Sequence, residues 1–127
     1  MTTYRTIPAS FITKATKIVS DFDLTMKAVD QAGDMLSKHR EKLSAIKNDF
    51  SQLLELIKAW AKREYKEVPW KTIVLALAAT LYLINPMDLI PDMIVPVGLT
   101  DDVAVISLIL ASLKKDIDQF LLWRNQS

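Results

Sequence analysis

Apolar residues in the first half of the chain recur at alternating spacings of four and three positions. This spacing places apolar side chains on one face of a helix, and no segment sustains the period of two that is typical of a strand. Only Thr25 and His39 interrupt the apolar seam, whose members are Phe11, Ala15, Ile18, Phe22, Val29, Ala32, Leu36, Leu43, Ile46, Phe50, Leu53, Ile57 and Trp60. The sequence therefore predicts an all-α fold of four or five helices without a sheet.

Breaks in this first half are expected where helix-capping residues stand. Ser20, Asp21 and Asp23 favour the N-cap position, so a short first helix should end there and a second should begin at about Leu24. A further break between Ser37 and Glu41 is left open, because the residues there are also compatible with an exposed helix. The segment from Leu24 to Tyr65 is thus one helix or two.

The second half is more hydrophobic and predicts a helical hairpin. A connection at Glu67 to Trp70 leads into Thr72 to Ile84, an uncharged run that is apolar all round and is therefore expected to be buried. A second apolar run, Val103 to Leu113, continues as the more amphipathic segment Lys114 to Trp123 and should pack antiparallel to the first.

A proline-rich turn is expected to join these two runs. Three prolines stand in eleven residues, at Pro86, Pro91 and Pro96, and proline interrupts regular helix. Residues before proline favour extended backbone, which applies to Ile90 and Val95.

Helix caps are expected around the same turn. Asn85 is predicted to cap a short helical turn, with Asp88 completing a capping box, and Gly98 can adopt a positive φ. Asp101 and Asp102 are predicted to introduce the last helix.

Length and composition indicate one domain, residues 1–127, with amphipathic basic helices over 1–67 and a hydrophobic hairpin containing the DLIPD loop over 68–127. The chain has a net charge of +1, and the two parts carry about +3 and −2. It contains no Cys, and its N-terminus does not resemble a signal peptide. We therefore expect a cytoplasmic protein, with peripheral contact to a membrane as an option.

Four carboxylates, together with the side-chain oxygen of Asn85, form the candidate polar site. Asp88, Asp92, Asp101 and Asp102 supply oxygen ligands of the kind that Mg²⁺ and Ca²⁺ prefer. The favoured interpretation is that these residues cap helices and bond the backbone of the turn, so no metal and no cofactor is predicted.

The residue types that enzymes commonly use for catalysis are not arranged in a recognisable pattern. His39 is the sole histidine and has no nucleophile or carboxylate at a telling spacing, so we predict a non-enzymatic protein. Lys58, Lys62 and Lys66, with Arg63 nearby, form a basic face, but interleaved glutamates favour a solvated surface over binding of nucleic acid.

The turn also carries a family resemblance. The pattern Tyr82, Pro86, Asp88, Leu89, Ile90, Pro91, Asp92, Gly98, Asp101 and Asp102 resembles the signature of the YkvA-like family. Tyr65, Val68 to Trp70 and Phe120 to Trp123 resemble its flanking segments, and the similarity covers Asp30 to Trp123. The resemblance implies the fold, and it implies no activity, because the family has no established chemistry.

Three functions remain open at this point. The preferred hypothesis is an adaptor or inhibitor, immunity-like in character, that binds a protein partner or a second copy through its amphipathic helices. The first alternative is a membrane-associated hairpin. Its uncharged runs are 16 residues from Thr72 to Met87 and 11 from Val103 to Leu113, which is shorter than the roughly 20 residues that a spanning helix needs. If the folded protein instead touches a bilayer surface without inserting, the contact is expected to involve Trp60, Tyr65 and Trp70. The second alternative is a cation-dependent site at the aspartates.

Overall fold

The structure is a computed structural model, which describes the backbone of residues 9–41, 43–89 and 95–126 and the side chains of 12–41, 43–84 and 106–126. Its helices are α1 (Ala9–Ile18), α2 (Phe22–Lys38), α3 (Ser44–Ala61), α4 (Trp70–Leu89) and α5 (Val95–Gln126). No strand occurs in these ranges, which confirms the predicted all-α fold.

The first break lies where the capping residues predicted it. Asp21 is the N-cap of α2, with extended backbone (φ −112°, ψ 111°), and its carboxylate accepts a hydrogen bond of 3.1 Å from the N–H of Leu24. Ser20 donates its hydroxyl to the carbonyl of Lys17 at 3.0 Å, at the end of α1. A side-chain acceptor at the N-cap satisfies a backbone donor that has no partner within the helix, which allows α2 to start here.

The break leaves the phase of the apolar seam unchanged, and one assignment within the seam is wrong. Phe22, predicted as a seam residue, is 49% exposed, whereas Thr25, the polar residue at the next seam position, is fully buried. Thr25 donates its hydroxyl to the carbonyl of Ile18 at 3.0 Å, which satisfies this polar group inside the bundle. Phe22 is the first residue of α2, next to the break, whereas the later seam positions of α2 are buried.

The second break, which the sequence left open, is present. Helix α2 ends at Lys38, α3 begins at Ser44, and Leu43 in the connection is fully buried. Because α2 and α3 contact each other, the reversal brings two amphipathic faces onto the same core.

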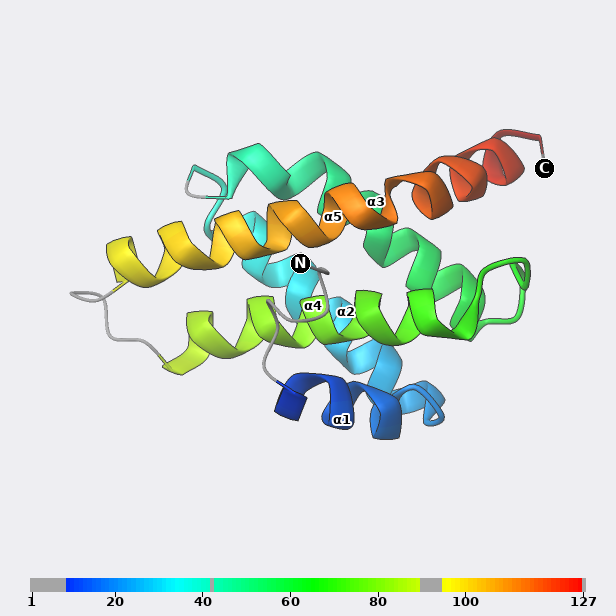
Figure 1. The fold of residues 1–127 in the computed structure, drawn as a ribbon, viewed down its shortest axis with the longest axis horizontal. Helices are drawn as coiled ribbons and strands as arrows, with labels where there is room; N and C mark the ends of the chain where they lie inside the picture. The colour runs from blue at the N-terminus through cyan, green and yellow to red at the C-terminus, as the bar shows by residue number, and fades with distance from the viewer. Residues whose placement is uncertain (1–8, 42, 90–94, 127) are drawn as a thin grey trace.

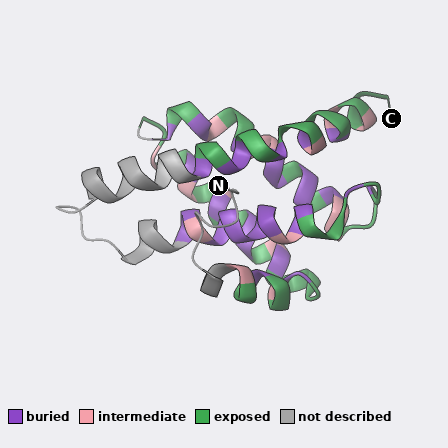
Figure 2. Ribbon diagram, in the orientation of Figure 1, coloured by how far each residue is buried: buried purple, intermediate pink, exposed green. Residues whose placement is uncertain are grey.

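Helix α4 is the central element of the bundle. It contacts all four other helices and runs antiparallel to α5, as Figure 1 shows. Figure 2 shows that its described part is buried on nearly every side, and Leu77 and Ala78 are completely inaccessible. The amphipathic N-terminal helices therefore pack on a hydrophobic hairpin, as predicted.

Nearly all the seam residues of the first half are buried in this packing. From Ala15 to Ile57 the seam members are buried, apart from Phe22 and the half-buried Ile18, and Trp60 at its end is half-buried too. The seam is thus an internal surface of the chain.

At the signature the helices are longer than predicted. Helix α4 continues through Asn85 and Pro86 to Leu89, so Asn85 lies inside a helix and is not an N-cap. Proline is tolerated here because its missing N–H removes one hydrogen bond close to the end of the helix. The short separate turn with a capping box at Asp88 is therefore wrong.

The start of the last helix also differs from the prediction. Helix α5 begins at Val95, so its first turn contains Pro96 and no acidic residue. Proline fits the first turn, where the N–H has no helical partner in any case. Asp101, Asp102 and Gly98 consequently lie inside the helix, which rules out the predicted capping by Asp101 and the predicted extended backbone at Val95. Ile90, Pro91 and Asp92 fall outside the described residues.

Candidate functional site: a basic and aromatic groove

The four signature aspartates remain a candidate that the described side chains do not test. Asp88 lies in the last turn of α4, and Asp101 and Asp102 lie in the second turn of α5. Their side chains and that of Asp92 are outside the described set, as are those of Asn85, Pro86, Pro91 and Gly98. Tyr82, the remaining signature residue, is half-buried on α4. Among side chains that are described, no three His, Asp or Glu residues gather closely enough to hold a metal ion.

The segments that flank the signature meet at the other end of the hairpin. The ring of Tyr65, which precedes α4, lies 5.3 Å from that of Phe120 and 5.0 Å from that of Trp123, both on α5. Phe120 and Trp123 stack at 5.8 Å. This aromatic cluster fixes the connection between α3 and α4 against the C-terminal helix.

Polar groups near this cluster add a defined electrostatic feature. Thr72 donates its hydroxyl to a carboxylate oxygen of Asp116 at 2.7 Å, which joins the start of α4 to α5. Burial of Tyr65, which is 3% exposed, raises the pKa of its phenol above the ordinary value, and the carboxylates of Glu67 and Asp116 raise it further.

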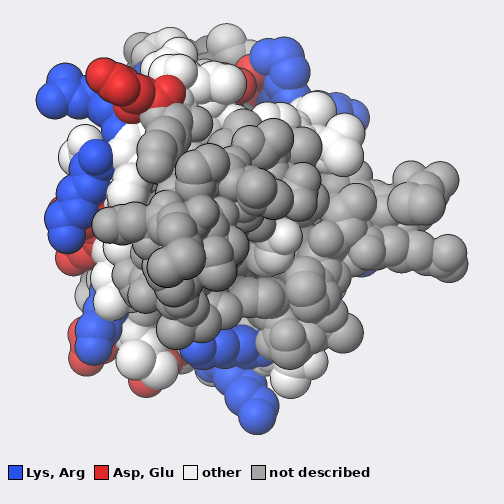
Figure 3. Space-filling view, turned by 90° about the vertical axis from the view of Figure 1, so that its left-hand side faces the viewer, with Lys and Arg blue, Asp and Glu red and all other residues white. Residues whose placement is uncertain are grey.

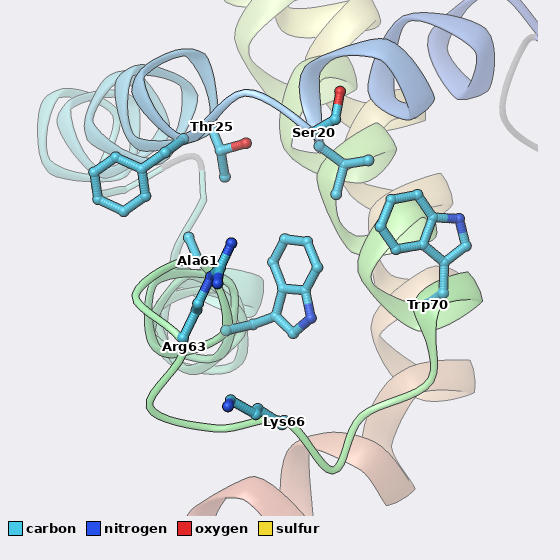
Figure 4. Close-up of a pocket in the computed structure, with 9 residues that line it drawn as sticks. Ser20, Thr25, Ala61, Arg63, Lys66 and Trp70 are labelled. Carbon is cyan, nitrogen blue, oxygen red and sulfur yellow. The ribbon is translucent and has the colours of Figure 1, made fainter.

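An open groove of about 640 Å³ lies at the same end of the bundle, on the right in Figure 1. It is formed by the turn between α1 and α2, the end of α3, the connection after it and the start of α4. Its lining residues are Val19, Ser20, Phe22, Thr25, Trp60, Ala61, Arg63, Lys66 and Trp70. We call it the basic-aromatic groove, and Figure 4 shows it in close-up.

Two large apolar side chains that line the basic-aromatic groove are strongly exposed. The described part of the chain has five such side chains: Phe22 and Trp70 line the groove, and Leu24 lies outside the lining, two positions after Phe22. Trp70 is 54% exposed, and its ring packs edge-on against that of Trp60 at 5.9 Å. The other two, Leu108 and Leu122, lie on α5.

Arg63 enters the groove from an uncommon backbone conformation. Its φ is 63°, the only positive φ of a non-glycine residue in the described chain. The N–H of Arg63 bonds the carbonyl of Trp60 and the N–H of Glu64 bonds that of Ala59, both at 2.9 Å, which is the Schellman ending of a helix. Glycine usually occupies this left-handed position, so an arginine here is a departure from the rule.

The basic face that the sequence suggested is divided by this helix end. Helix α3 stops at Ala61, so Lys66 does not share a helix face with Lys58 and Lys62. Lys66 instead lines the groove with Arg63, and among the described residues neither side chain has a carboxylate partner. The sequence identified these cations but gave no signal that they face two tryptophans.

Elsewhere on the molecule the described charges are mixed. Figure 3 faces the end opposite the groove, where Lys and Arg side chains lie beside Asp and Glu side chains around the rim. Arg124 pairs with Glu55, and Lys114 with Asp118. His39 is half-buried in the connection after α2, and among the described residues it belongs to no group of three or more His, Asp or Glu that could hold a metal ion.

Within the described residues, no helix is both long enough and apolar enough to span a bilayer.

Comparison with known proteins places the chain in a family. Residues 72–108 match the family described as protein of unknown function DUF1232. The chain is 33% identical over 94 residues to the "Uncharacterized membrane protein YkvA" of Bacillus subtilis (strain 168), a match that spans 74% of this chain and 88% of that protein. No solved structure was found to match. With the predicted signature, the helical hairpin and this relative in agreement, the chain belongs to the YkvA-like family, whose function is unknown.

Proposed function

We propose that this protein is a peripheral membrane protein that docks on a bilayer surface with the end that carries the basic-aromatic groove. The observation that carries the proposal is that two strongly exposed apolar side chains, Phe22 and Trp70, line the same groove as two cations without described partners. Leu24, a third exposed apolar residue, follows two positions after Phe22. Tryptophan favours the interface between headgroups and acyl chains, because its ring is apolar and its N–H is polar.

The magnitude of the interaction suits reversible attachment. Full burial of a large apolar side chain contributes about 1.5–3 kcal/mol, and these three side chains are already about half buried in the protein. Together they would contribute roughly 2–5 kcal/mol, which is far less than insertion of a spanning helix provides. Electrostatic attraction between the cations and the bilayer must supply the remaining free energy of membrane binding.

The relative supports this reading in one respect, since the Bacillus subtilis protein is called a membrane protein. Surface docking reconciles that name with a bundle whose described helices are too short or too polar to span a bilayer.

Binding of a protein partner or of a second copy stays a proposal. The apolar residues along the amphipathic helices that suggest it pack against the hairpin, so they do not form a free surface for a partner. Its remaining basis is the exposed end itself, which a protein partner would have to occupy in place of a bilayer.

Flotation with lipid vesicles tests the membrane proposal. Wild-type protein should float with vesicles made of phosphatidylcholine and phosphatidylglycerol, and a carbonate wash should release it, as expected for a peripheral protein. The double variant Phe22→Ser, Trp70→Ser should remain at the bottom of the gradient, because it lacks two of the apolar anchors.

The matched control is Leu108→Ser, which removes an equally exposed leucine, 57% accessible, from the middle of α5. It should float like the wild type. Failure of the wild type to float with any vesicle, or flotation of the double variant at wild-type level, would refute membrane docking and leave a protein partner as the better use of this end.

A further inference from the structure

We infer that the basic-aromatic groove binds the phosphate of an anionic phospholipid headgroup, with Arg63 as the group that contacts it and Lys66 as a second cation in the lining. The inference rests on the proposed membrane docking and adds the chemistry that the groove selects. Two cations line the groove and no carboxylate does. The groove is therefore complementary to an anion, although the chain as a whole is nearly neutral.

Arg63 is the best placed of the two cations. Its guanidinium can bond two phosphate oxygens at once, which is a geometry that lysine cannot offer. Figure 4 shows the side chain rising from the end of α3 into the groove, on the side of Thr25. The left-handed backbone that holds it there is sterically unfavourable for arginine, and such outliers gather at binding sites.

Only some of the side chains in the groove can donate a hydrogen bond to a phosphate. The hydroxyls of Ser20 and Thr25 already donate to backbone carbonyls, so they have no hydrogen left for a ligand. The indole N–H groups of Trp60 and Trp70 have no hydrogen-bond partner among the described residues. Two cations and two indoles thus remain as donors around the groove.

The apolar lining favours a lipid over a free phosphate ion. Val19 and Phe22 contribute hydrocarbon to the same groove as the cations. A free phosphate would leave this surface in water, whereas the glycerol and upper acyl carbons of a lipid would cover it. The ligand class that matches both sides is an anionic phospholipid.

Acidic residues stand near the groove and weaken the positive potential of the surface around it. Asp21 and Asp23 stand at the start of α2, and Glu64 and Glu67 stand in the connection before α4, all outside the lining. A preference for anionic lipid must then come from the groove, since the surrounding surface is mixed in charge.

Binding isotherms with two kinds of vesicle test the inference. Affinity for vesicles containing phosphatidylglycerol should exceed that for pure phosphatidylcholine by about tenfold or more, and Lys66→Gln should remove about fivefold of it. Arg63→Gly should lose at least as much, although glycine suits the backbone there, so a loss cannot be attributed to misfolding. Both variants should bind pure phosphatidylcholine like the wild type.

Lys38→Gln is the matched control, because Lys38 is an exposed lysine at the far end of α2, about 24 Å along the helix from Phe22. Its affinity should stay within about twofold of wild type. Equal binding of both vesicle types, or an equal loss in Lys38→Gln and Lys66→Gln, would overturn the groove as a headgroup site while leaving membrane docking intact. Absence of binding to either vesicle would overturn both.

A final arm separates lipid from free phosphate. Inorganic phosphate added at the ionic strength of a chloride control should displace the protein from vesicles no better than chloride. Displacement specific to phosphate would overturn the lipid assignment and identify the groove as a phosphate site.

Discussion

Arg63 shows how one residue can serve a site at the expense of the fold. The left-handed conformation is roughly 1–2 kcal/mol unfavourable for a residue with a Cβ, whereas glycine adds only about 0.5–1 kcal/mol of backbone entropy to the unfolded chain. Arg63→Gly should therefore raise the free energy of unfolding by about 0.5–1 kcal/mol in urea denaturation. Arg63→Ala keeps the strain and should stay within about 0.5 kcal/mol of wild type. A destabilised glycine variant would contradict this view of the helix end.

Tyr65 provides a pH-dependent signature at the same end. Its folded-state pKa is raised by burial first, then by Glu67 and Asp116. The phenol's contribution to stability is therefore complete below pH about 10 and is lost as the pH rises through the folded-state pKa. The ultraviolet titration of wild type minus that of Tyr65→Phe should show a tyrosine that ionises above the ordinary value. A difference curve centred at or below that value would contradict the buried environment.

At the scale of elements, the caps decide where the amphipathic helices turn. Asp21→Ala should destabilise the protein by about 1 kcal/mol, because the N–H of Leu24 loses its acceptor. Asp30→Ala is the control, since Asp30 is exposed in the middle of α2, where alanine is an excellent helix former. Thermal or urea unfolding of the two variants measures the difference. Equal effects would mean that Asp21 acts through its charge alone.

Local sequence predicted the elements that local chemistry determines. The cap at Asp21 and the burial of α4 followed from side-chain type and from an uncharged run. The helix ends at the signature were predicted less well, because proline in a sequence suggests that a helix is interrupted. Pro86 and Pro96 instead lie in the last turn of α4 and the first turn of α5, which tolerate proline. The sequence thus predicts the break between the two helices, but it places the helix caps several residues too far inside the hairpin.

The basic-aromatic groove was beyond local reasoning. Phe22 and Trp70 are 48 positions apart in the sequence, and their neighbourhood depends on how α1, α3 and α4 pack. The spacing predicts Phe22 in the core, and it contains no sign that the first residue of α2 is left exposed at the end of the bundle. Arg63 lines the same groove as two tryptophans because of the Schellman turn at the end of α3. A glycine at that position would have indicated such a turn in the sequence, and an arginine does not.

At the scale of the whole molecule, the bundle has two distinct ends joined by its central helix. Helix α4 begins beside the groove at Trp70 and ends beside the signature at Leu89, about 30 Å away. Most of the described hydrophobic residues in the two uncharged runs are buried between these ends. The bundle can therefore dock on a bilayer without opening, and the end of α4 at Leu89 would then point away from the surface.

The central claim is that the groove end, and not the rest of the folded bundle, enters the interface. Because the chain has no Cys, a single introduced cysteine can carry an environment-sensitive fluorophore without further changes. At vesicle concentrations that bind all the protein, a fluorophore on Phe22→Cys should brighten, shift to shorter wavelength and be quenched by nitroxide lipids. The same fluorophore on Leu108→Cys should keep the emission it has in water. Quenching at position 108 with none at position 22, or at neither position, would contradict the account.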